Sequence, residues 1–173
     1  EILYQLKQKI LLLIQKQKLK VMSNQTDDIK DSISRYLSMR EHSRKELIDK
    51  LSRKDFDMDS ILKCVDEFSM KDLQSDDRYT ESYVRSKYND HKGPNFISAS
   101  LRSKGIDANT ADKALSFYDC KDWEKTAIAA LEKKTIYRNI EPVKCKIKQK
   151  MFLSGRGFSY KTIEYALNEY WKK

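Results

Sequence analysis

Glycine and proline are scarce in this sequence, which holds four glycines and two prolines among its 173 residues. These two residues mark most turns and loops, so long loops are not expected. Apolar residues make up 39% of the chain and charged residues 35%, and that apolar share lies below the usual globular value. The composition therefore predicts a helical protein with a thin core and an extensive surface.

Cysteine is also rare. Cys64, Cys120 and Cys145 are widely spaced and no C-x-x-C pair occurs, which argues against a zinc ribbon and a thioredoxin-like redox motif. A chain without a disulfide framework is typical of a reducing compartment, so we expect a cytoplasmic protein. Cys64 and Cys145 fall in helical patterns and are expected to be small packing residues.

Long apolar runs are missing. The longest, Ile10–Ile14, has five residues, too few for a bilayer-spanning helix or a signal-peptide core, so no membrane partner is expected. Around this run an apolar stripe with helical spacing indicates an amphipathic helix that could pack, dimerise or lie on a membrane surface; it comprises Leu3, Leu6, Ile10 and Leu13. Because Met22-Ser23-Asn24 resembles a natural start, we expect residues 1–22 to be a lead-in helix that packs on the chain or is an upstream appendage.

Catalytic motifs are absent as well. No H-E-x-x-H, G-x-S-x-G or P-loop pattern occurs, and the two histidines, His42 and His91, lie apart. Asp76-Asp77 has the look of a metal pair, but it opens a helix, where carboxylates cap the helix and meet its dipole. We therefore predict no enzyme activity, no cofactor and no metal site.

The sequence does contain a pattern that occurs three times. The segments are LSRKDFDMDSILKCV (51–65), LRSKGIDANTADKAL (101–115) and LSGRGFSYKTIEYAL (153–167), with apolar residues at matching offsets and periods of 50 and 52 residues. Self-similarity of this kind predicts a modular array. Each segment has the pattern of two helices joined by a short turn.

Helix-start and turn signals support this interpretation. The helix that enters the turn starts with a capping box at Ser43 and Glu46, or with Pro94 or Pro142 in its first turn. Gly105 and Gly157 suit a left-handed helix end, whereas Asp55 is a poorer residue at the same place. The N-caps predicted for the last helices are Asp57, Asp107 and Ser159.

A further helix precedes each pair. Its apolar face is formed by Ile29, Ile33, Tyr36 and Leu37 in the first copy, by Tyr79, Tyr83, Val84 and Tyr88 in the second, and by Trp123, Ala127, Ile128 and Leu131 in the third. We interpret these aromatic residues as core and not as a base-stacking platform. The prediction is an all-α protein with three tandem three-helix modules, at residues 23–73, 74–119 and 120–173, after the lead-in helix.

The net charge of +9 is unevenly distributed. Residues 1–21 carry +4, residues 22–120 carry −2, and residues 121–173 carry +7, from 13 basic and six acidic side chains. A basic end suggests a polyanionic partner, most often nucleic acid, although it can also serve only as a solubilising surface. The candidate partner-binding or DNA-binding residues are Lys92, Arg102, Lys104, Lys144, Lys146, Lys148, Lys150 and Arg156.

Four of these lysines alternate along one predicted helix. Lys146 and Lys150 share one face and Lys144 and Lys148 another, because residues four apart are neighbours on a helix. Ile147 and Met151 offer the apolar face between them, so we expect one lysine pair to flank the core and the other to point outward. Arg156 extends the basic area at the next turn.

Several segments resemble the RecX family of recombinase regulators: REHSRKELIDKL (40–51), SDDRYTESYVRSK (75–87), KGPNFISASLRSKGI (92–106) and FLSGRGFSYKTIEYAL (152–167). The resemblance covers residues 27–170. It implies an elongated, curved array of three-helix repeats that binds RecA and its filaments on single-stranded DNA. It also implies inhibition of the recombinase, ATPase and coprotease activities of RecA, and weaker, non-specific binding of single-stranded DNA by a monomer.

The chain departs from the family pattern at two places: Asp55 stands where a glycine is usual, and Gln74-Ser75 replaces Leu-Asp. The resemblance carries no catalytic residues. The alternative interpretation is a sequence-specific helix-turn-helix DNA-binding protein. Its reading helices would begin with Asp57-Met58-Asp59, Asp107-Ala108-Asn109 and Ser159-Tyr160-Lys161, so acidic side chains would face phosphates in two of the three modules.

Overall fold

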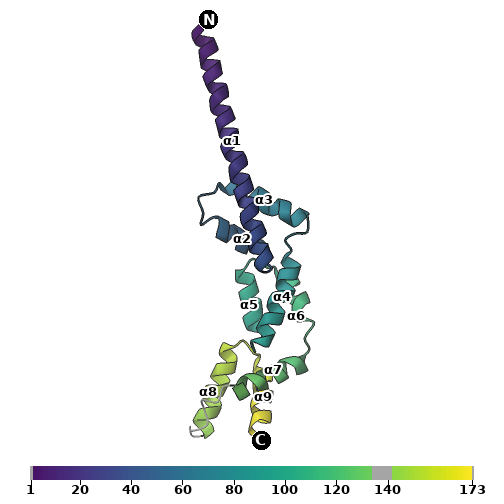
Figure 1. Ribbon diagram of the computed structural model, residues 1–173. Helices are drawn as coiled ribbons and strands as arrows, with labels where there is room; N and C mark the ends of the chain where they lie inside the picture. Colours follow the sequence, from purple (N-terminus) through teal and green to yellow (C-terminus); the bar gives the residue numbers. More distant parts are fainter. Residues whose placement is uncertain (1, 134–141, 173) are drawn as a thin grey trace. The chain divides into compact units, whose positions relative to one another are not determined.

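The computed structural model describes residues 2–133 and 142–172, and in these two ranges every regular element is a helix (Figure 1). The all-α prediction is confirmed. In chain order the helices are α1 (Ile2–Met39), α2 (Arg44–Leu51), α3 (Met58–Met70), α4 (Asp76–Asn89), α5 (Pro94–Ser103), α6 (Ala108–Leu115), α7 (Cys120–Lys133), α8 (Pro142–Gly155) and α9 (Tyr160–Lys172).

The chain divides into two compact units, Glu1–Ser75 and Asp76–Lys173. In the first unit, α1 and α2 both pack on α3. In the second unit, α4 and α5 pack on α6, while α7 and α8 pack on α9. The chain therefore repeats one arrangement, in which a last helix is covered by the two helices that precede it.

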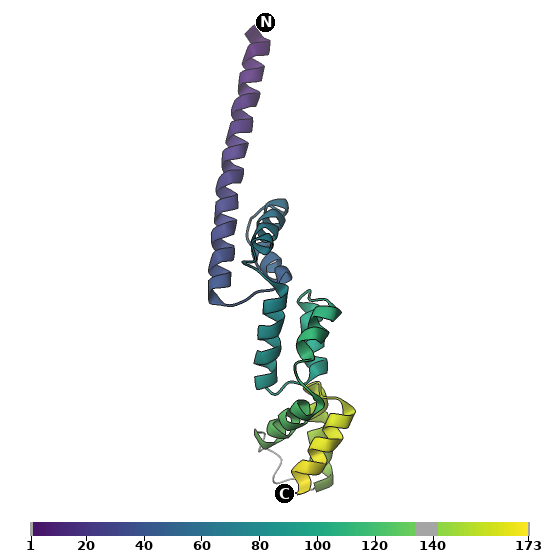
Figure 2. The same ribbon diagram turned by 90° about the vertical axis from the view of Figure 1, so that its right-hand side faces the viewer.

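The lead-in helix is continuous with the first helix of the first unit, which differs from the sequence prediction. The prediction that the lead-in helix over residues 1–22 and the helix that carries Ile29 are separate is wrong, because α1 runs without interruption from Ile2 to Met39. The segment between the two apolar patterns is polar but contains no glycine or proline, so nothing in it forces the helix to end. Figure 2 shows the N-terminal part of α1 extending beyond α2 and α3.

The apolar stripe of the lead-in segment does not pack on the first unit. Leu6, Ile10 and Leu13 are each more than half exposed, and the side chain of Leu3 lies outside the described ones. Of the two alternatives, packing of these three residues on the first module is therefore wrong, and an upstream appendage stays a prediction. Among the side chains of α1 whose burial is described, the first buried one is Ile29.

The repeated apolar positions form the cores of the two units. In the first unit Ile29, Ile33, Leu51, Ile61 and Val65 are buried in one cluster. In the second unit a single cluster spans α4–α9, and it includes Tyr79, Val84, Leu101, Ile106, Ala111, Trp123, Ala127, Leu131, Leu153, Phe158, Ile163 and Leu167. The interpretation of the aromatic residues as core is confirmed for Tyr79 and Trp123. The remaining two aromatics of α4, Tyr83 and Tyr88, are partly buried against the same cluster.

The predicted N-caps are confirmed. The side chains of Ser43, Asp57, Asp107 and Ser159 each accept a hydrogen bond from the backbone N–H three residues later. Such bonds satisfy N–H groups that have no acceptor within the helix. They also fix the direction in which each helix leaves its turn.

The turn between the last two helices differs among the three repeats, because its residues differ. Gly105 and Gly157 adopt φ angles of 81° and 86°, the left-handed conformation that glycine enters without steric cost. Asp55 is not among the described residues with positive φ. In the first unit Phe56 N donates to the Lys54 carbonyl, whereas the equivalent Ile106 N and Phe158 N donate to the carbonyls of Leu101 and Leu153.

Two glycines allow the turn between α8 and α9 to lie against the start of α5. Gly93 N donates to the carbonyl of Arg156 at 2.8 Å, and Asn95 N donates to the carbonyl of Gly157 at 3.1 Å. Gly93 is the N-cap of α5 and has no side chain to cap it, so these two carbonyls accept hydrogen bonds from the helix start. A β-carbon on Gly93 would lie 2.5 Å from the Gly157 carbonyl carbon.

An aromatic cluster also joins the helices α4–α6 to the helices α7–α9. Tyr88 of α4 stacks on Tyr118 with ring centroids 4.2 Å apart, and both rings contact Trp123 of α7 at 5.4 Å. Aromatic pairs of this geometry stabilise beyond the area that they bury. The second unit is therefore joined internally at two places, one of backbone and one of side chains.

We predict that Gly93→Ala destabilises the second unit, because the new methyl group meets backbone that cannot rotate away. The expected cost is about 1–3 kcal/mol, the usual range for overpacking, seen as a lower midpoint of thermal unfolding. Gly155→Ala is the matched control, since a β-carbon there meets nothing within 4 Å. Equal midpoints for the two variants would contradict the close approach.

A buried histidine in the first unit takes part in a network of polar contacts. His42 is 1% exposed, and its Nδ1 lies 2.9 Å from the carbonyl oxygen of Arg40 while its Nε2 lies 2.7 Å from Lys50 Nζ. A carbonyl only accepts and an ammonium only donates, so the ring is neutral with its proton on Nδ1. Gln74 completes the group, because its Nε2 donates to the His42 carbonyl at 3.2 Å.

Burial lowers the pKa of His42 below its usual 6.5, and the positive charges of Arg40 and Lys50 act in the same direction. Below about pH 6.5 the unfolded chain takes up a proton that the folded chain excludes, so stability present above that pH is lost as the pH falls towards the folded pKa. We predict that His42→Gln reduces the loss of thermal stability between roughly pH 7.5 and 5.5.

Some pH dependence will remain in that variant. Burial, together with the charges of Lys133 and Arg156, also lowers the pKa of His91, which contributes with the same sign. The measurement is therefore the difference between wild type and variant in the shift of the unfolding midpoint. An identical shift in both proteins would show that His42 is not excluded from protonation in the folded state.

Candidate interaction surface

The described residues contain no group of three or more His, Cys, Asp or Glu side chains placed to hold a metal ion. Within the described part of the chain, no helix is both long enough and apolar enough to cross a bilayer. Cys64 and Cys145 are buried and Cys120 is exposed, and none of these three described residues forms a disulfide. The packing role predicted for Cys64 and Cys145 is confirmed.

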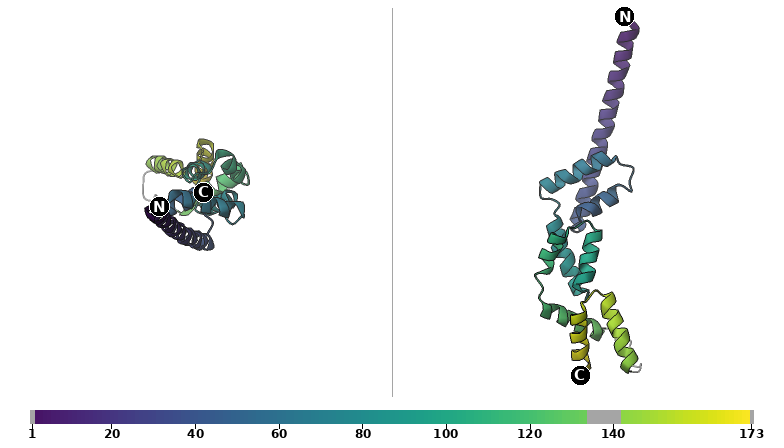
Figure 3. Two further views of the ribbon diagram at one scale, coloured as in Figure 1. Left: turned by 90° about the horizontal axis from the view of Figure 1, so that it is seen from above. Right: turned by 180° about the vertical axis from the view of Figure 1, so that it is seen from behind.

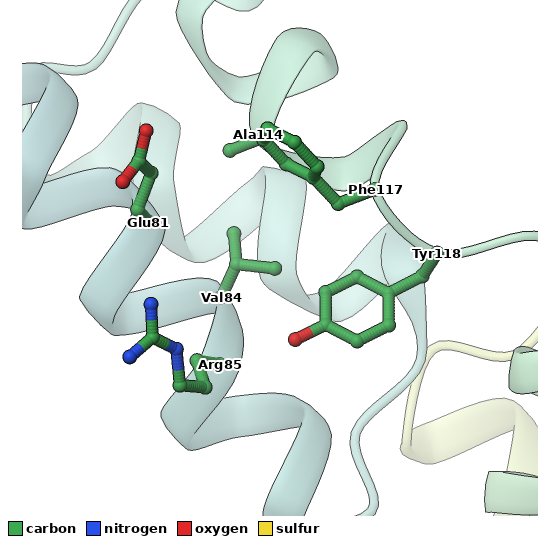
Figure 4. Close-up of a pocket in the computed structure, with 6 residues that line it drawn as sticks. All are labelled: Glu81, Val84, Arg85, Ala114, Phe117 and Tyr118. Carbon is green, nitrogen blue, oxygen red and sulfur yellow. The ribbon is translucent and has the colours of Figure 1, made fainter.

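A pocket of about 310 Å³ lies between α4 and the end of α6 (Figure 4). Its lining consists of Glu81, Val84, Arg85, Ala114, Phe117 and Tyr118. Phe117 at its edge is 72% exposed. The lining has two opposite charges and four apolar or aromatic side chains, a mixture that is common in pockets that bind a ligand or a side chain of a partner.

The eight predicted basic residues do not form one surface. Lys92 and Arg156 lie at the contact between the start of α5 and the α8–α9 turn, Arg102 and Lys104 lie at the end of α5, and the four lysines of residues 144–150 lie on α8. Lys104 Nζ is 5.7 Å from the ring centroid of Tyr83, and Arg102 is exposed. The structure thus places the set at three separate sites of the second unit.

Arg156 has an internal structural role. Its Nη1 donates to the carbonyls of Asp90 at 2.7 Å and His91 at 3.0 Å, and its guanidinium carbon lies 4.8 Å from the ring centroid of Phe152. Lys92 lies nearby, and burial followed by the charge of Arg156 lowers its pKa. A substitution of Arg156 therefore affects the stability of the turn as well as any binding.

The core-facing side of α8 differs from the prediction. Cys145, Gln149 and Leu153 are buried, whereas Ile147 and Met151 are exposed. The expectation that Ile147 and Met151 supply the face beside the core is wrong. The physical reason is that Cys145 and Leu153 pack inward on the same face as Gln149, whose Oε1 accepts a part-buried hydrogen bond from Trp171 Nε1 of α9 at 2.9 Å. With its amide paired, Gln149 can face the interior.

The pairing of the α8 lysines agrees with the prediction. Lys146 and Lys150 both reach towards α9: Lys146 Nζ lies 5.1 Å from the Trp171 ring centroid, and Lys150 Nζ lies 2.7 Å from Glu164 Oε1. The ion pair with Glu164 raises the pKa of Lys150. Lys144 and Lys148 are exposed. The helix therefore carries one lysine row beside the core and one on the opposite border of its outer face.

Sequence reasoning missed the partners that set this geometry. The spacing of Gln149, four residues from both Cys145 and Leu153, places it on their face, but a glutamine on a helix is ordinarily exposed. A signal existed in Trp171, whose indole N–H requires an acceptor wherever the ring is partly buried. The contact between Gly93 and Gly157 could not be predicted from the sequence around either glycine.

Comparison with known proteins gives the family. Models of two domains match this chain: "RecX, first three-helix domain" at residues 30–68 and "RecX, second three-helix domain" at residues 75–115. These ranges correspond to the helices α1–α3 and α4–α6.

Curated relatives extend the match over most of the chain. A protein named Regulatory protein RecX from Chromohalobacter salexigens is 31% identical over 87% of this chain and 98% of its own length. One from Neisseria gonorrhoeae is 36% identical over 78% of this chain and 86% of its own.

Solved structures agree. The crystal structure of RecX from Lactobacillus salivarius, 32% identical, matches 87% of this chain and 99% of its own with a TM-score of 0.74. Another crystal structure, of a regulatory protein RecX, matches 86% of this chain and 74% of its own at 27% identity with a TM-score of 0.76. With this agreement in domains, sequence and fold, the chain belongs to the RecX family of regulatory proteins.

Proposed function

We propose that this protein binds RecA and its filaments on single-stranded DNA, and that it inhibits the recombinase, ATPase and coprotease activities of RecA. It would thereby regulate DNA repair and recombination. The observation that carries the proposal is family membership across 98% of the length of a relative named a regulatory protein. As a second property we propose weaker, non-specific binding of single-stranded DNA by a monomer.

The inhibition proposed here requires no chemistry. A protein that occupies the surface of a filament can block the entry of a second DNA strand and restrict the subunit movements on which ATP hydrolysis depends. Three helix groups built to one plan suit a partner that is itself a repeating assembly. Several weak contacts on one chain then add through effective concentration.

The basic third module is the contact that we favour. Residues 121–173 carry a net charge of +7, and α8 contains four lysines and no acidic residue. Lys144, Lys146 and Lys148 are exposed, so they can meet phosphates or acidic protein surface without rearrangement of the fold. Long-range attraction of this kind raises the association rate and weakens with salt.

Sequence-specific DNA reading by the last helices is less well supported. Asp57 and Asp107 are the N-caps of α3 and α6, at the helix ends that would approach the bases. Hydrogen bonds from the backbone of Ser60 and Thr110 lower the pKa of these two carboxyls. They are therefore ionised at neutral pH and would repel the phosphates on either side of a groove.

We predict that replacing Lys144, Lys146 and Lys148 with Gln weakens binding to RecA filaments on single-stranded DNA by about ten-fold at low salt and flattens the salt dependence. Filament binding and inhibition of ATP hydrolysis are measured over a salt series. Circular dichroism should be unchanged, because these side chains are exposed. Lys150 and Arg156 are left intact because an ion pair and backbone hydrogen bonds tie them into the fold. Lys146 lies against the Trp171 ring, so the unfolding midpoint of the variant is measured together with its binding.

A second triple variant serves as the control. Arg53, Lys63 and Lys113 are also exposed, and replacing them with Gln removes the same charge from other helix groups. Equal weakening by both variants would show that only net charge matters. Full inhibition by the α8 variant at wild-type concentrations would exclude the third module as the contact.

A further inference from the structure

The outer face of α8 carries an apolar stripe. Val143, Ile147 and Met151 are 65%, 56% and 69% exposed and follow one another at four-residue intervals, so they are neighbours along one face. The stripe extends over about 12 Å of helix. Single exposed apolar residues are ordinary, but a contiguous row marks a surface that another molecule covers.

This stripe lies on the outer surface of the second unit, on the side of α8 that faces away from the core. Figure 3 shows α8 beside α9 in the view from behind, and α8 packs on both α7 and α9. Cys145, Gln149 and Leu153 occupy the buried side. Burial of Cys145 and Leu153 together with the Gln149–Trp171 hydrogen bond sets the rotation of the helix, so the three apolar side chains lie on its outer face.

Lysines border the stripe on both sides. Successive residues of a helix are rotated by about 100°, which places Lys144 and Lys148 along one edge and Lys146 and Lys150 along the other. The helix has no acidic residue. The contacts of Lys146 with Trp171 and of Lys150 with Glu164 hold the second row beside the α8–α9 seam.

An apolar stripe between two rows of lysines suits some classes of partner better than others. Nucleic acid would pair with the lysines, but the aliphatic side chains between them give bases no aromatic face on which to stack. A second copy would set lysine rows against lysine rows. An acidic amphipathic helix matches both features, because its apolar side chains cover the stripe while its carboxylates reach the lysines on either border.

We propose that the outer face of α8 is the docking site for an acidic amphipathic segment of a partner protein. The identity of that partner rests on the proposed function, whereas the chemistry of the site does not. In this arrangement the lysines guide the approach and the apolar stripe supplies the short-range contact. The surface therefore recognises protein, and single-stranded DNA binds elsewhere on the chain.

The test is the double variant Ile147→Gln/Met151→Gln, which keeps every lysine. Its control is Met39→Gln/Met70→Gln, at two methionines that are 78% and 87% exposed on the first unit. The first probe is the RecA filament on single-stranded DNA, with single-stranded DNA alone as a second arm. We expect the α8 variant to bind filaments about ten-fold more weakly, with DNA binding and the unfolding midpoint unchanged, and the control to bind as wild type does.

The second probe does not depend on RecA. It is a synthetic helical peptide with leucines at four-residue intervals flanked by glutamates, compared with a peptide of the same charge in which glutamine replaces leucine. Wild type should prefer the leucine peptide, and the α8 variant should bind both equally. Failure of wild type to bind RecA filaments would overturn the proposed function alone, while the peptide preference still decides the role of the stripe.

Three results would overturn the docking site. The first is equal binding of both peptides by wild type. The second is a loss of DNA binding by the α8 variant in parallel with filament binding, which would assign the face to nucleic acid. The third is a wild-type dimer that the α8 variant abolishes, detected by sedimentation, which would assign the face to a second copy.

Discussion

The arrangement of the second unit depends on the close approach of two glycine backbones. The start of α5 has N–H groups without intrahelical acceptors and an N-cap residue, Gly93, without a side chain. Carbonyls of the α8–α9 turn accept hydrogen bonds from Gly93 and Asn95. A side chain at either Gly93 or Gly157 would meet neighbouring backbone at 2.5 Å or less, so the contact exists only because both positions lack a β-carbon.

Several further contacts follow from that approach. Arg156 stands in the turn, so its guanidinium reaches the carbonyls of Asp90 and His91 and is unavailable as a freely moving surface charge. Lys92 is brought beside it, which together with burial lowers the pKa of the lysine. The same approach fixes the end of α8, and with it the position of the lysines and the apolar stripe relative to α5.

The outer surface of α8 depends on which of its faces packs on α7 and α9. The opposite rotation of α8 would bury Ile147 and Met151 and expose Cys145, Gln149 and Leu153 between the lysines instead. With Gln149 inside and paired to Trp171, the apolar side chains lie outside between two lysine rows. A surface that combines both kinds of side chain favours an acidic protein segment, since neither free phosphate nor an apolar groove would satisfy all of it.

Much of the architecture was determined by the sequence alone. The threefold spacing of apolar residues, the caps at Ser43, Asp57, Asp107 and Ser159, and the glycine turns at Gly105 and Gly157 are local features, and each is confirmed. Local features depend on residues a few positions apart, whose geometry the chain itself fixes. The same reasoning failed for the break in α1, where polar residues without glycine or proline leave the helix intact.

Only the tertiary structure decided which face of α8 is buried and which basic residues are exposed for contact with a partner. Gln149 meets Trp171 from 22 residues away, and Arg156 meets Asp90 from 66 residues away. A periodic pattern states which residues share a face of a helix, but it does not state which face points inward when a buried polar group finds a partner. That choice depends on hydrogen bonds between distant segments, and these exist only once the helices have packed.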